Sequence, residues 1–250
     1  MICAGPKRSG RTTTLYAVLA ESATDDRSVF SIERHLEHIV RSANQMEAGD
    51  PADFTLADGI RAALHQDADL ILVDELADAE TAGLAIQAAI DGRLVLASVH
   101  AGDAVGAIRR LLEMGVEPSA LAAAVILVVG ERLVRRVCTA CAAPYVPPPA
   151  ELAFFRHRTT ARKSVFAHGE GCDACSGTGY RGRTGVFELL RIDDRARDLI
   201  ANRSTSAALH ELAAGHGMRS LQDEGLRLVT EGVTTIAEII RSLSAMEVQR

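Results

Sequence analysis

Short apolar runs alternate with longer stretches of helical spacing through the first half of the chain. The apolar runs contain few polar residues, which predicts strands that are covered on both faces. They comprise residues 28–32, 70–73 and 93–99. Amphipathic spacing predicts three helices between them, at residues 13–20, 56–65 and 79–90. Strict alternation of strand and helix predicts crossover connections and a parallel sheet, to which residues 1–4 would add a short strand.

The pattern changes twice in the second half of the chain. Two more helices are predicted at residues 104–114 and 119–129, after which prolines and glycines become frequent and the sequence predicts irregular structure. Helical spacing then returns in four segments, at residues 195–202, 206–214, 218–231 and 236–243. We therefore expect an α/β protein in three parts: a core over residues 1–137, an excursion over 138–190 and a helical region over 191–250.

Composition and charge narrow the class of protein. Apolar residues make up 48% and charged residues 24% of the 250 residues, which is typical of a soluble globular protein. The net charge of -6 gives no reason to expect a nucleic-acid partner. The longest apolar run, residues 120–129, is about half of what a helix needs to span a bilayer. The first residues do not have the pattern of a signal peptide, so we expect an intracellular protein.

A phosphate-binding motif follows the first predicted strand. The sequence GPKRSGRT at residues 5–12 fits G-x-x-x-x-G-K-[ST], except that Arg11 replaces the lysine. In this motif, backbone amides and a helix N-terminus bind phosphate oxygens, the cation neutralises the outer phosphates and the hydroxyl binds Mg²⁺. A guanidinium keeps the charge but is longer and planar, and Arg8 is expected to narrow the loop further. A strand-to-helix turn without a ligand is the alternative.

A second acidic feature lies later in the chain. The apolar strand LILV at residues 70–73 ends in Asp74 and Glu75. P-loop proteins place an acid beside Mg²⁺, and an acid that orients water, at such a strand end. Two solvated carboxylates are the alternative. The two motifs together, in this order, predict a P-loop NTPase fold.

Four of the five cysteines form two Cys-x-x-Cys pairs. The pairs are Cys138 with Cys141 and Cys172 with Cys175. Two such pairs supply the four thiolates of a closed, structural zinc site. A redox pair or simply buried thiols are the alternatives. His168 could replace one ligand, although we expect it in a loop, and the fifth cysteine, Cys3, is expected in the core.

The glycines at residues 177–182 spell G-x-G-x-x-G, the fingerprint of a dinucleotide site. Such a site requires a strand before the motif and a helix after it. Here a cysteine pair precedes the motif and the strand-like GVFELL follows it. We therefore interpret these glycines as tight turns beside the cysteine pairs.

Several long blocks resemble the traffic ATPases of type II secretion and type IV pilus assembly. They are LVDELADAETAGLAIQAAIDGRLVLASVHAGDAVGAIRRLLEMGVEP at residues 72–118, RLVRRVCTAC at 132–141, GCDACSGTGYRGRTGVFELL at 171–190 and GMRSLQDEGLRLVTEGVTT at 217–235. The resemblance implies a RecA-like ATPase core that forms hexameric rings at the cytoplasmic face of the inner membrane. There, ATP turnover drives polymerisation of pilin or pseudopilin subunits, and the ring docks on platform proteins of the membrane.

The resemblance also implies roles for individual residues. Glu75 matches the glutamate of the family's acidic strand, and Glu33 and Glu37 match the acids of its aspartate box. Glu75 and Glu33 would polarise the attacking water, and Asp74 would hold the water shell of Mg²⁺. His100 matches the histidine box and would sense the outer phosphate, although a histidine at a strand end is more often structural. ATP would be bound by Gly5, Ser9, Gly10, Arg11, Thr12 and Thr13, with Arg11 screening the outer phosphates and Thr12 as the Mg²⁺ ligand.

The chain also departs from the family's pattern. Arg11 stands for the lysine, Arg34 and His35 for Asp-Pro, Asp74 for a glycine, Ala77 for an arginine and Arg93 for a histidine. Each change is expected to touch phosphate, metal or a neighbouring subunit at one site. The family also has a long region before the phosphate loop, so the chain would be a fragment, a mis-assigned start or a degenerated copy.

Two hypotheses follow from these observations. The first is a motor subunit that binds ATP and hydrolyses it weakly. The second is a non-hydrolysing structural subunit of the same apparatus, which keeps the fold, the zinc site and the interfaces. The altered positions favour the second hypothesis, and the intact Glu75, Glu33 and His100 favour the first.

Overall fold

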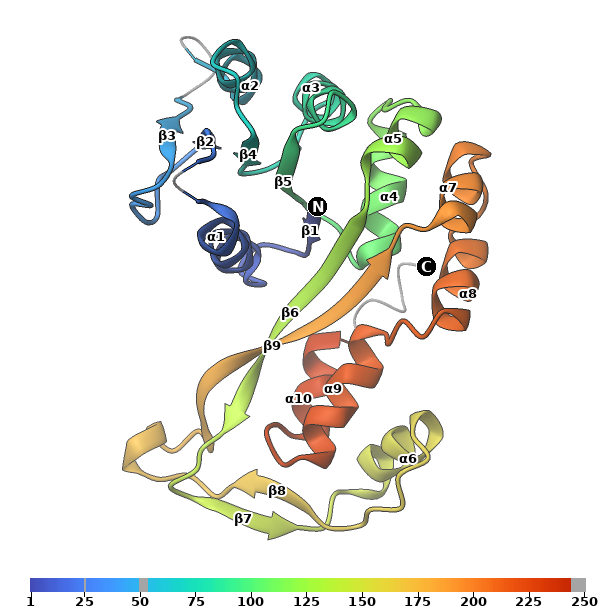
Figure 1. The fold of residues 1–250 in the computed structure, drawn as a ribbon. Helices are drawn as coiled ribbons and strands as arrows, with labels where there is room; N and C mark the ends of the chain where they lie inside the picture. Colours follow the sequence, from blue (N-terminus) through green and yellow to red (C-terminus); the bar gives the residue numbers. More distant parts are fainter. Residues whose placement is uncertain (25, 50–53, 244–250) are drawn as a thin grey trace. The chain divides into compact units, whose positions relative to one another are not determined.

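The computed structural model describes residues 1–24, 26–49 and 54–243 (Figure 1). They form two compact units: unit 1 comprises Met1–Gly130 and Leu189–Met218, and unit 2 comprises Glu131–Glu188 and the chain from Arg219 onward. The three parts expected from the sequence, divided at residues 137 and 190, remain a prediction. Within the described ranges, none of the helices has the length and apolar character needed to cross a bilayer.

Unit 1 is built on a mostly parallel sheet. Seven strands lie in the order β3-β2-β4-β5-β1-β6-β9. Their bounds are β1 Ile2–Ala4, β2 Val29–Glu33, β3 Asn44–Glu47, β4 Leu70–Val73, β5 Leu94–Val99, β6 Leu127–Val137 and β9 Tyr180–Arg191. Parallel pairs join β3 to β2, β2 to β4, β4 to β5, β5 to β1 and β1 to β6. The α/β fold predicted from the apolar runs is confirmed, including the short first strand.

Alternate strand residues face two different layers of helices. On one face, Leu70 and Leu72 of β4 belong to a buried cluster with Leu15 and Leu19 of α1 (Arg11–Ser22). On the other face, Ile71 and Val73 of β4 belong to a larger buried cluster with residues of the remaining helices of unit 1. These are α2 Leu56–His65, α3 Ala79–Ile90, α4 Ala104–Glu113, α5 Pro118–Ala124, α7 Asp194–Ala201 and α8 Ser206–Gly215. Burial on both faces explains why the strands are continuous apolar runs.

The helices of unit 1 begin in two different ways. Thr55 forms a capping box with Asp58 at the start of α2, and Asp78 and Asp103 accept backbone N–H bonds at the starts of α3 and α4. The helix α1 instead begins after Gly10, without a side-chain cap and without an acidic residue in its first turn. The positive end of α1 is therefore left to another partner, and an anion suits it.

Two features of the sheet differ from the sequence-based expectation. The helix expected at residues 119–129 is wrong in its second half, because α5 ends at Ala124 and Leu127 already begins β6. The β-branched residues Val125 and Val128 favour extended backbone, and both are buried. The sequence also gave no sign of β3, since its residues NQME are mostly polar and lie at the edge of the sheet.

Unit 2 has more regular structure than its prolines suggested. Its elements, besides the adjoining parts of β6 and β9, are β7 Ala142–Tyr145, α6 Pro149–Arg158, β8 Phe166–Gly169, the 3₁₀ turn Asp173–Cys175, α9 Leu221–Thr230 and α10 Ile236–Leu243. Phe155 and Phe166 meet edge to face, with ring centroids 4.9 Å apart, in a core that α9 and α10 complete. The expectation of an irregular excursion is therefore wrong. Pro149 stands at the start of α6, where proline is compatible with a helix.

The four helices predicted near the end of the chain are confirmed, two in each unit.

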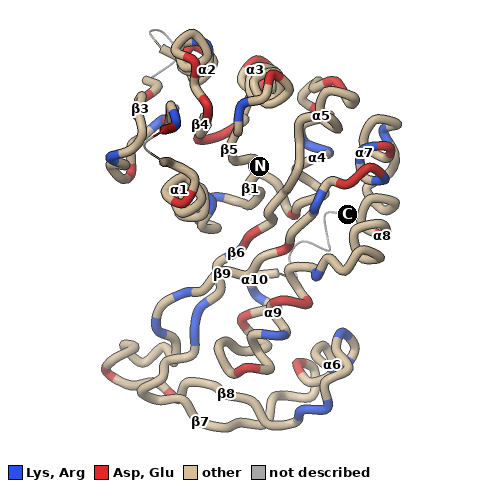
Figure 2. The backbone as a smooth tube through the Cα atoms, viewed as in Figure 1, with Lys and Arg blue, Asp and Glu red and all other residues tan. Residues whose placement is uncertain are grey.

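The net charge differs between the two units (Figure 2). Unit 1 carries more Asp and Glu than Lys and Arg, whereas the opposite holds in unit 2. An anion that binds to unit 1 must therefore be attracted by local donors and cations, because the net charge of this unit repels it.

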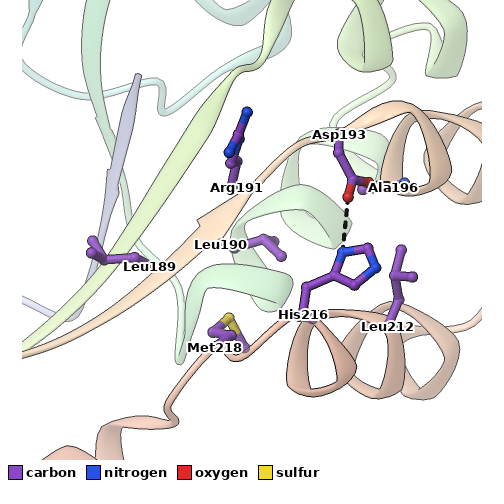
Figure 3. Close-up of a pocket in the computed structure, with 9 residues that line it drawn as sticks. Leu189, Leu190, Arg191, Asp193, Ala196, Leu212, His216 and Met218 are labelled. Carbon is purple, nitrogen blue, oxygen red and sulfur yellow. Dashed lines mark hydrogen bonds and ion pairs between the residues drawn. The ribbon is translucent and has the colours of Figure 1, made fainter.

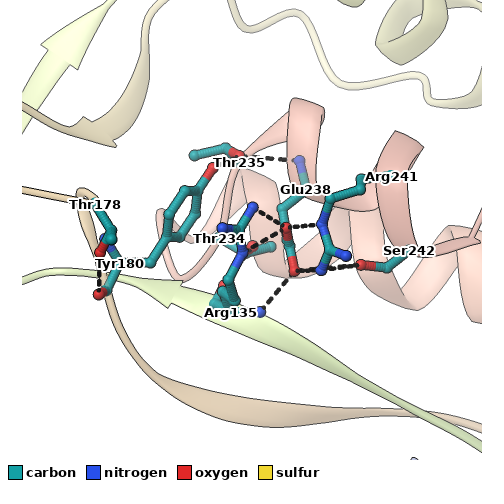
Figure 4. Close-up of polar contacts among 8 residues, drawn as sticks. All are labelled: Arg135, Thr178, Tyr180, Thr234, Thr235, Glu238, Arg241 and Ser242. Carbon is teal, nitrogen blue, oxygen red and sulfur yellow. Dashed lines mark hydrogen bonds and ion pairs between the residues drawn. The ribbon is translucent and has the colours of Figure 1, made fainter.

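A buried carboxylate organises the polar contacts of unit 2 (Figure 4). Glu238 of α10 is fully buried and accepts hydrogen bonds from Nε and Nη2 of Arg135 at 2.9 and 2.7 Å and from Nε and Nη2 of Arg241 at 2.8 and 2.6 Å. The Arg135 guanidinium also stacks over the ring of Tyr180, 4.1 Å from its centroid. Burial alone would raise the pKa of Glu238, but the hydrogen bonds from Arg241 and Arg135 outweigh it and lower the pKa to about 2.

We predict that Glu238→Gln lowers the free energy of unfolding by about 2–3 kcal/mol at pH 7, because it removes charge-assisted hydrogen bonds to a buried acceptor. The pKa of Glu238 is depressed in the folded state, so its contribution is complete above the ordinary value of 4.5 and is lost as the pH falls toward 2. Urea denaturation from pH 7 to pH 3 measures both effects. Glu231→Gln, at an exposed position paired with Arg227, is the control and should change stability by less than about 0.5 kcal/mol. Equal losses in the two variants would refute the prediction.

Candidate functional site

The parallel register brings the ends of four strands to one edge of the unit 1 sheet, called the carboxyl edge below. Ile32 of β2 lies beside Val73 of β4, which lies beside Ala97 of β5. Ala4 of β1 lies beside Val99 of β5. The residues that follow these strands therefore meet at the carboxyl edge, where open α/β sheets bind their ligands.

The loop between β1 and α1 is anchored at this edge. The amide of Gly5 donates to the carbonyl of Val99 at 3.3 Å. Gly10 ends the loop with φ 109°, a left-handed conformation that glycine adopts without strain. The hydroxyl oxygen of Ser9 is buried and has no hydrogen-bond partner among the described residues. A buried hydroxyl without a partner, beside an uncapped helix N-terminus, suits a phosphate oxygen.

Arg8 lies in this loop with an unusual backbone. It adopts φ 66°, which is rare for a residue with a side chain, and the residue is exposed. The expectation that Arg8 narrows the loop stays a prediction. Thr12 and Thr13 lie in the first turn of α1, directly after Arg11.

Arg11 joins the loop to the second acidic strand. Its Nη1 lies 3.2 Å from Oε1 of Glu75, although the two residues are 64 positions apart in the sequence. Only 13% of the Arg11 side chain and 26% of the Glu75 side chain are exposed, so solvent screens this ion pair less than a surface pair. The phosphate loop and the acidic end of β4 are therefore in direct contact.

Three carboxylates gather at the carboxyl edge. Glu33 ends β2, while Asp74 and Glu75 follow β4. Burial raises the pKa of Asp74, and the charges of Glu33 and Glu75 raise it further. A weak hydrogen bond of 3.4 Å from the amide of Arg34 lowers the pKa but does not outweigh these effects. Such a cluster of oxygens suits Mg²⁺, a hard cation that prefers carboxylate and water ligands.

Glu33 is buried more deeply than its neighbours. It is 1% exposed, and its Oε2 accepts a hydrogen bond of 2.5 Å from the hydroxyl of Tyr16, while the hydroxyl of Ser31 donates to Oε1. Neither hydroxyl group is predicted from the sequence. Ser31 could have been found from its spacing, because it lies two residues before Glu33 on the same face of a strand. Tyr16 gave no such signal in the sequence.

The other predicted residues lie at two different edges of the sheet. His100 directly follows β5 at the carboxyl edge and is exposed. Arg93 precedes β5, at the opposite end of the strand, and its guanidinium donates to the carbonyl of Asp91 at 2.9 Å. The expectation that all the altered positions lie at one site is therefore wrong for Arg93. The functional roles of the residues at the carboxyl edge stay predictions.

The four cysteines of unit 2 converge on one point. The Sγ atoms of Cys138 and Cys172 are 3.9 Å apart, as are those of Cys141 and Cys175, and all four lie within 4.8 Å of one another. A tetrahedral zinc ion with Zn–S bonds of about 2.3 Å separates its sulfur ligands by about 3.8 Å. The spacing therefore fits a tetrahedral thiolate site and excludes disulfides, whose S–S bond is about 2.05 Å.

Backbone amides support this thiolate site. The amides of Cys172 and Gly179 each donate to Sγ of Cys175 at 3.2 Å. Burial disfavours the thiolate of Cys175, but the hydrogen bonds from these amides outweigh the effect of burial and lower the pKa of Cys175 to about 6.

Gly179 has φ 73° and lies so close to Gly169 that a side chain at Gly179 would collide with the Gly169 carbonyl. The interpretation of the motif as tight turns holds for Gly177 and Gly179, which lie before β9 with positive φ, but it is wrong for Gly182, which lies within β9. The expectation that His168 lies in a loop is wrong, since it belongs to β8, where it lies beside the carbonyl of Ala143 and outside the sulfur cluster.

A separate pocket of about 490 Å³ lies in unit 1 between the end of β9 and the helices α7 and α8 (Figure 3). Its apolar lining consists of three leucines, two alanines and Met218. Its polar lining includes Arg191 and a contact of 2.8 Å between Nδ1 of His216 and Oδ2 of Asp193. None of the residues predicted to bind nucleotide or metal lines this pocket.

Three comparisons with known proteins agree with one another. The family model described as "Type II/IV secretion system protein" matches residues 1–241. The type II secretion system protein E of Pseudomonas aeruginosa is 40% identical over 241 residues, which are 96% of this chain and 48% of that protein. The type IV pilus assembly ATPase PilB of Thermus thermophilus is 39% identical over 237 residues, 94% of this chain and 27% of PilB. The X-ray structure of the ATPase DotB from Legionella pneumophila has a TM-score of 0.69 at 19% identity and covers 100% of this chain and 60% of DotB.

The chain spans about half the length of the type II relative and about a quarter of the pilus relative. The similarity to DotB, at 19% identity, concerns the fold alone. The activity, substrates and partners of these longer proteins are therefore matters for proposal in this chain.

We predict that Asp74→Asn raises the free energy of unfolding by about 1 kcal/mol at pH 7, because it removes a partly buried charge that two other carboxylates repel. The pKa of Asp74 is raised in the folded state, so the charged form weakens folding at neutral pH. This penalty disappears as the pH falls below the ordinary value of 3.8. Thermal unfolding without Mg²⁺ measures the effect, with the exposed Glu113→Gln as the control for loss of one negative charge. A variant that is no more stable than the wild type would contradict the repulsion inferred here.

Proposed function

Because the chain belongs to the type II/IV secretion system protein family, we propose that it binds ATP with Mg²⁺ at the carboxyl edge and hydrolyses it weakly. In this proposal it is the RecA-like motor part of a type II secretion or type IV pilus assembly ATPase. The observation that supports the proposal best is the contact of 3.2 Å between Arg11 and Glu75. It joins the cation of the phosphate loop to an acid that can activate water.

The phosphate loop would bind the nucleotide through local donors. The amides from Ser9 to Thr13, with Gly5 and Gly10 allowing the turn, would surround the phosphate oxygens, and the Ser9 hydroxyl would gain the partner that it lacks. Arg11 would exchange Glu75 for the outer phosphates, since a phosphate offers its guanidinium two oxygens and a larger charge. The Thr12 hydroxyl and the water shell held by Asp74 would bind Mg²⁺, which supplies positive charge opposite the phosphates.

The acids would then act on water. Release from Arg11 would leave Glu75 free to accept a proton from a water molecule that attacks the outer phosphorus, while the bond to the bridging oxygen breaks and ADP leaves. Glu33 would orient this water, and His100 would contact the outer phosphate from the end of β5. Turnover is expected to be slow because Arg11 cannot place its charge as a compact ammonium does.

A non-hydrolysing structural subunit is the second candidate. The observation that favours it is the burial of Glu33, whose two oxygens are both engaged by the hydroxyls of Tyr16 and Ser31. A carboxylate held in this way has less freedom to reach water. This candidate keeps nucleotide binding or the fold without turnover.

Assembly and location follow from the family in this proposal. The chain would form a homohexameric ring that docks on platform proteins at the cytoplasmic face of the inner membrane and drives the assembly of pilin or pseudopilin subunits. Support comes from the names of the relatives, a type II secretion system protein and a pilus assembly ATPase. No nucleic acid partner and no membrane span are proposed.

Unit 2 would hold one structural zinc ion. Its four ligands would be Cys138, Cys141, Cys172 and Cys175. The amides that donate to Cys175 would stabilise the negative charge of the sulfur cluster. The ion would contribute to stability by joining the segment before β7 to the segment before β9.

We predict that Arg11→Lys binds Mg·ATP about tenfold more tightly than the wild type, because an ammonium places its charge nearer the phosphates. Isothermal titration calorimetry on zinc-loaded protein measures the affinity. Arg8→Lys is the matched control, since it makes the same exchange at an exposed position of the same loop and should leave the affinity unchanged. Unchanged affinity in Arg11→Lys, or no binding in any form of the chain, would count against the phosphate loop.

A phosphate-release assay on the same proteins separates the two candidates. Weak hydrolysis predicts that the wild type releases phosphate faster than Glu75→Gln, which cannot accept the proton of the attacking water. Equal rates in the two proteins, with nucleotide binding retained, would support the structural subunit.

For the cysteine cluster, we predict one zinc ion per chain by elemental analysis and a lower melting temperature of unit 2 after treatment with a strong chelator. Cys138→Ser should lose the metal. Cys3→Ser is the matched control, because Cys3 is a buried cysteine of the sheet and should leave the zinc content unchanged. Metal-free protein with the same melting temperature as the loaded protein would rule out a structural ion.

A further inference from the structure

Tyr16 lies between the two halves of the nucleotide site proposed above. It belongs to α1, the helix that begins at the phosphate loop, and it follows Thr12 by one helical turn. Its hydroxyl donates to Glu33 at the end of β2 with a distance of 2.5 Å. One side chain thus connects the helix that would bind phosphate to the acid that would orient water.

The sheet geometry explains why Tyr16 reaches this acid. Val29 and Leu72 belong to the buried cluster that packs on α1, and Tyr16 belongs to it too. Successive residues of a strand alternate between faces, so Ser31 and Glu33 lie on the same face of β2 as Val29. A carboxylate at this position points toward α1, where burial requires a hydrogen-bond donor.

The contact is buried on both sides. Tyr16 is 8% exposed and Glu33 is 1% exposed. Within the described residues, Glu33 forms no ion pair, and its carboxylate accepts hydrogen bonds from the hydroxyls of Tyr16 and Ser31. Burial, together with the Glu33 carboxylate, raises the pKa of Tyr16 to about 12, so the hydroxyl keeps the proton that it donates.

We propose that Tyr16 is a positioning residue that fixes the Glu33 carboxylate and transmits movement of the phosphate-loop helix to it. The inference rests on the proposed function, because it assigns Tyr16 a task at that nucleotide site. When the first turn of α1 binds phosphate, a shift of this helix moves the Tyr16 hydroxyl with it, since a helix of this length moves as one body. Glu33 follows, because its Oε2 depends on this donor.

The tyrosine content of the chain makes this testable by spectroscopy. The chain has three tyrosines and no tryptophan. Tyr145 and Tyr180 belong to unit 2, so Tyr16 is the single tyrosine of unit 1. Tyrosine emission and near-ultraviolet absorption depend on the hydrogen bond of the phenol, and a change in unit 1 is therefore reported by Tyr16.

The experiment titrates the full, zinc-loaded chain with Mg²⁺ and a non-hydrolysable ATP analogue while tyrosine emission is recorded. The wild type is expected to change its emission, and Tyr16→Phe is expected to lose this response while binding the analogue with an affinity within about threefold by calorimetry. Tyr145→Phe is the matched control. It also removes a hydroxyl that donates to a glutamate, Glu151, and it should keep the response of the wild type.

Turnover gives a second readout. In the phosphate-release assay, Tyr16→Phe is expected to lower kcat about tenfold with KM for ATP changed by less than about twofold, because it disturbs an orienting group and leaves the phosphate loop intact. In the Glu33→Gln background the same change should have no further effect on kcat. A loss that appears equally in KM, or that adds fully to Glu33→Gln, would overturn the positioning role.

The outcomes distinguish this inference from the proposed function. A wild type that does not bind the analogue refutes the proposed function and this inference with it. Binding without a change in tyrosine emission, or with a change that persists in Tyr16→Phe, overturns this inference alone. Loss of binding in a folded Tyr16→Phe also overturns it, because Tyr16 would then contribute to affinity.

Discussion

The balance of charge at the carboxyl edge is the constraint on which the rest of unit 1 depends. The parallel register brings Glu33, Asp74 and Glu75 together in a unit that already has an acidic excess. Carboxylates that share a partly buried edge repel one another unless cations or hydrogen-bond donors compensate them. In the described chain, the compensation comes mainly from α1, whose first residue, Arg11, pairs with Glu75 and whose Tyr16 donates to Glu33. One helix thus contacts acids from two different strands.

In this arrangement, an anion that binds at the start of α1 would also affect the Arg11–Glu75 ion pair. A phosphate bound at an uncapped helix N-terminus competes with Glu75 for the guanidinium of Arg11, because both are anions that the same cation can pair with. In the proposed function, binding of the nucleotide and release of Glu75 from Arg11 would therefore be two consequences of one exchange of partners. The buried Tyr16 contact lies a few residues further along the same helix, so the exchange and the orientation of Glu33 share a rigid element.

Much of the fold followed from patterns that burial imposes on the sequence, and the resemblance to the secretion and pilus ATPases is confirmed. Strands β2, β4 and β5 are buried on both faces, so they appear as apolar runs, and the cysteine spacing predicted a cluster that the structure forms. β3 could not be found, because an edge strand needs no apolar run. The sequence pattern predicts a helix at residues 125–129, where β6 begins instead, because a continuous apolar sequence does not distinguish a buried helix from a buried strand. Tyr16 was missed for another reason, since its partner Glu33 is adjacent in the fold and distant in the sequence.

The departures expected from the resemblance differ in where they lie relative to the carboxyl edge. Arg93 lies at the amino end of β5, so its exchange does not alter the charge of the carboxyl edge. The resemblance implies a glycine at the position of Asp74, whose carboxylate lies beside Glu33 and Glu75 and is opposed by burial and by repulsion. Arg11 replaces one cation by another and adds no charge to offset it. A divalent cation bound at this edge would therefore relieve the repulsion among the three carboxylates. The raised pKa of Asp74, which weakens folding without the ion, would then increase the gain in free energy when Mg²⁺ binds near it.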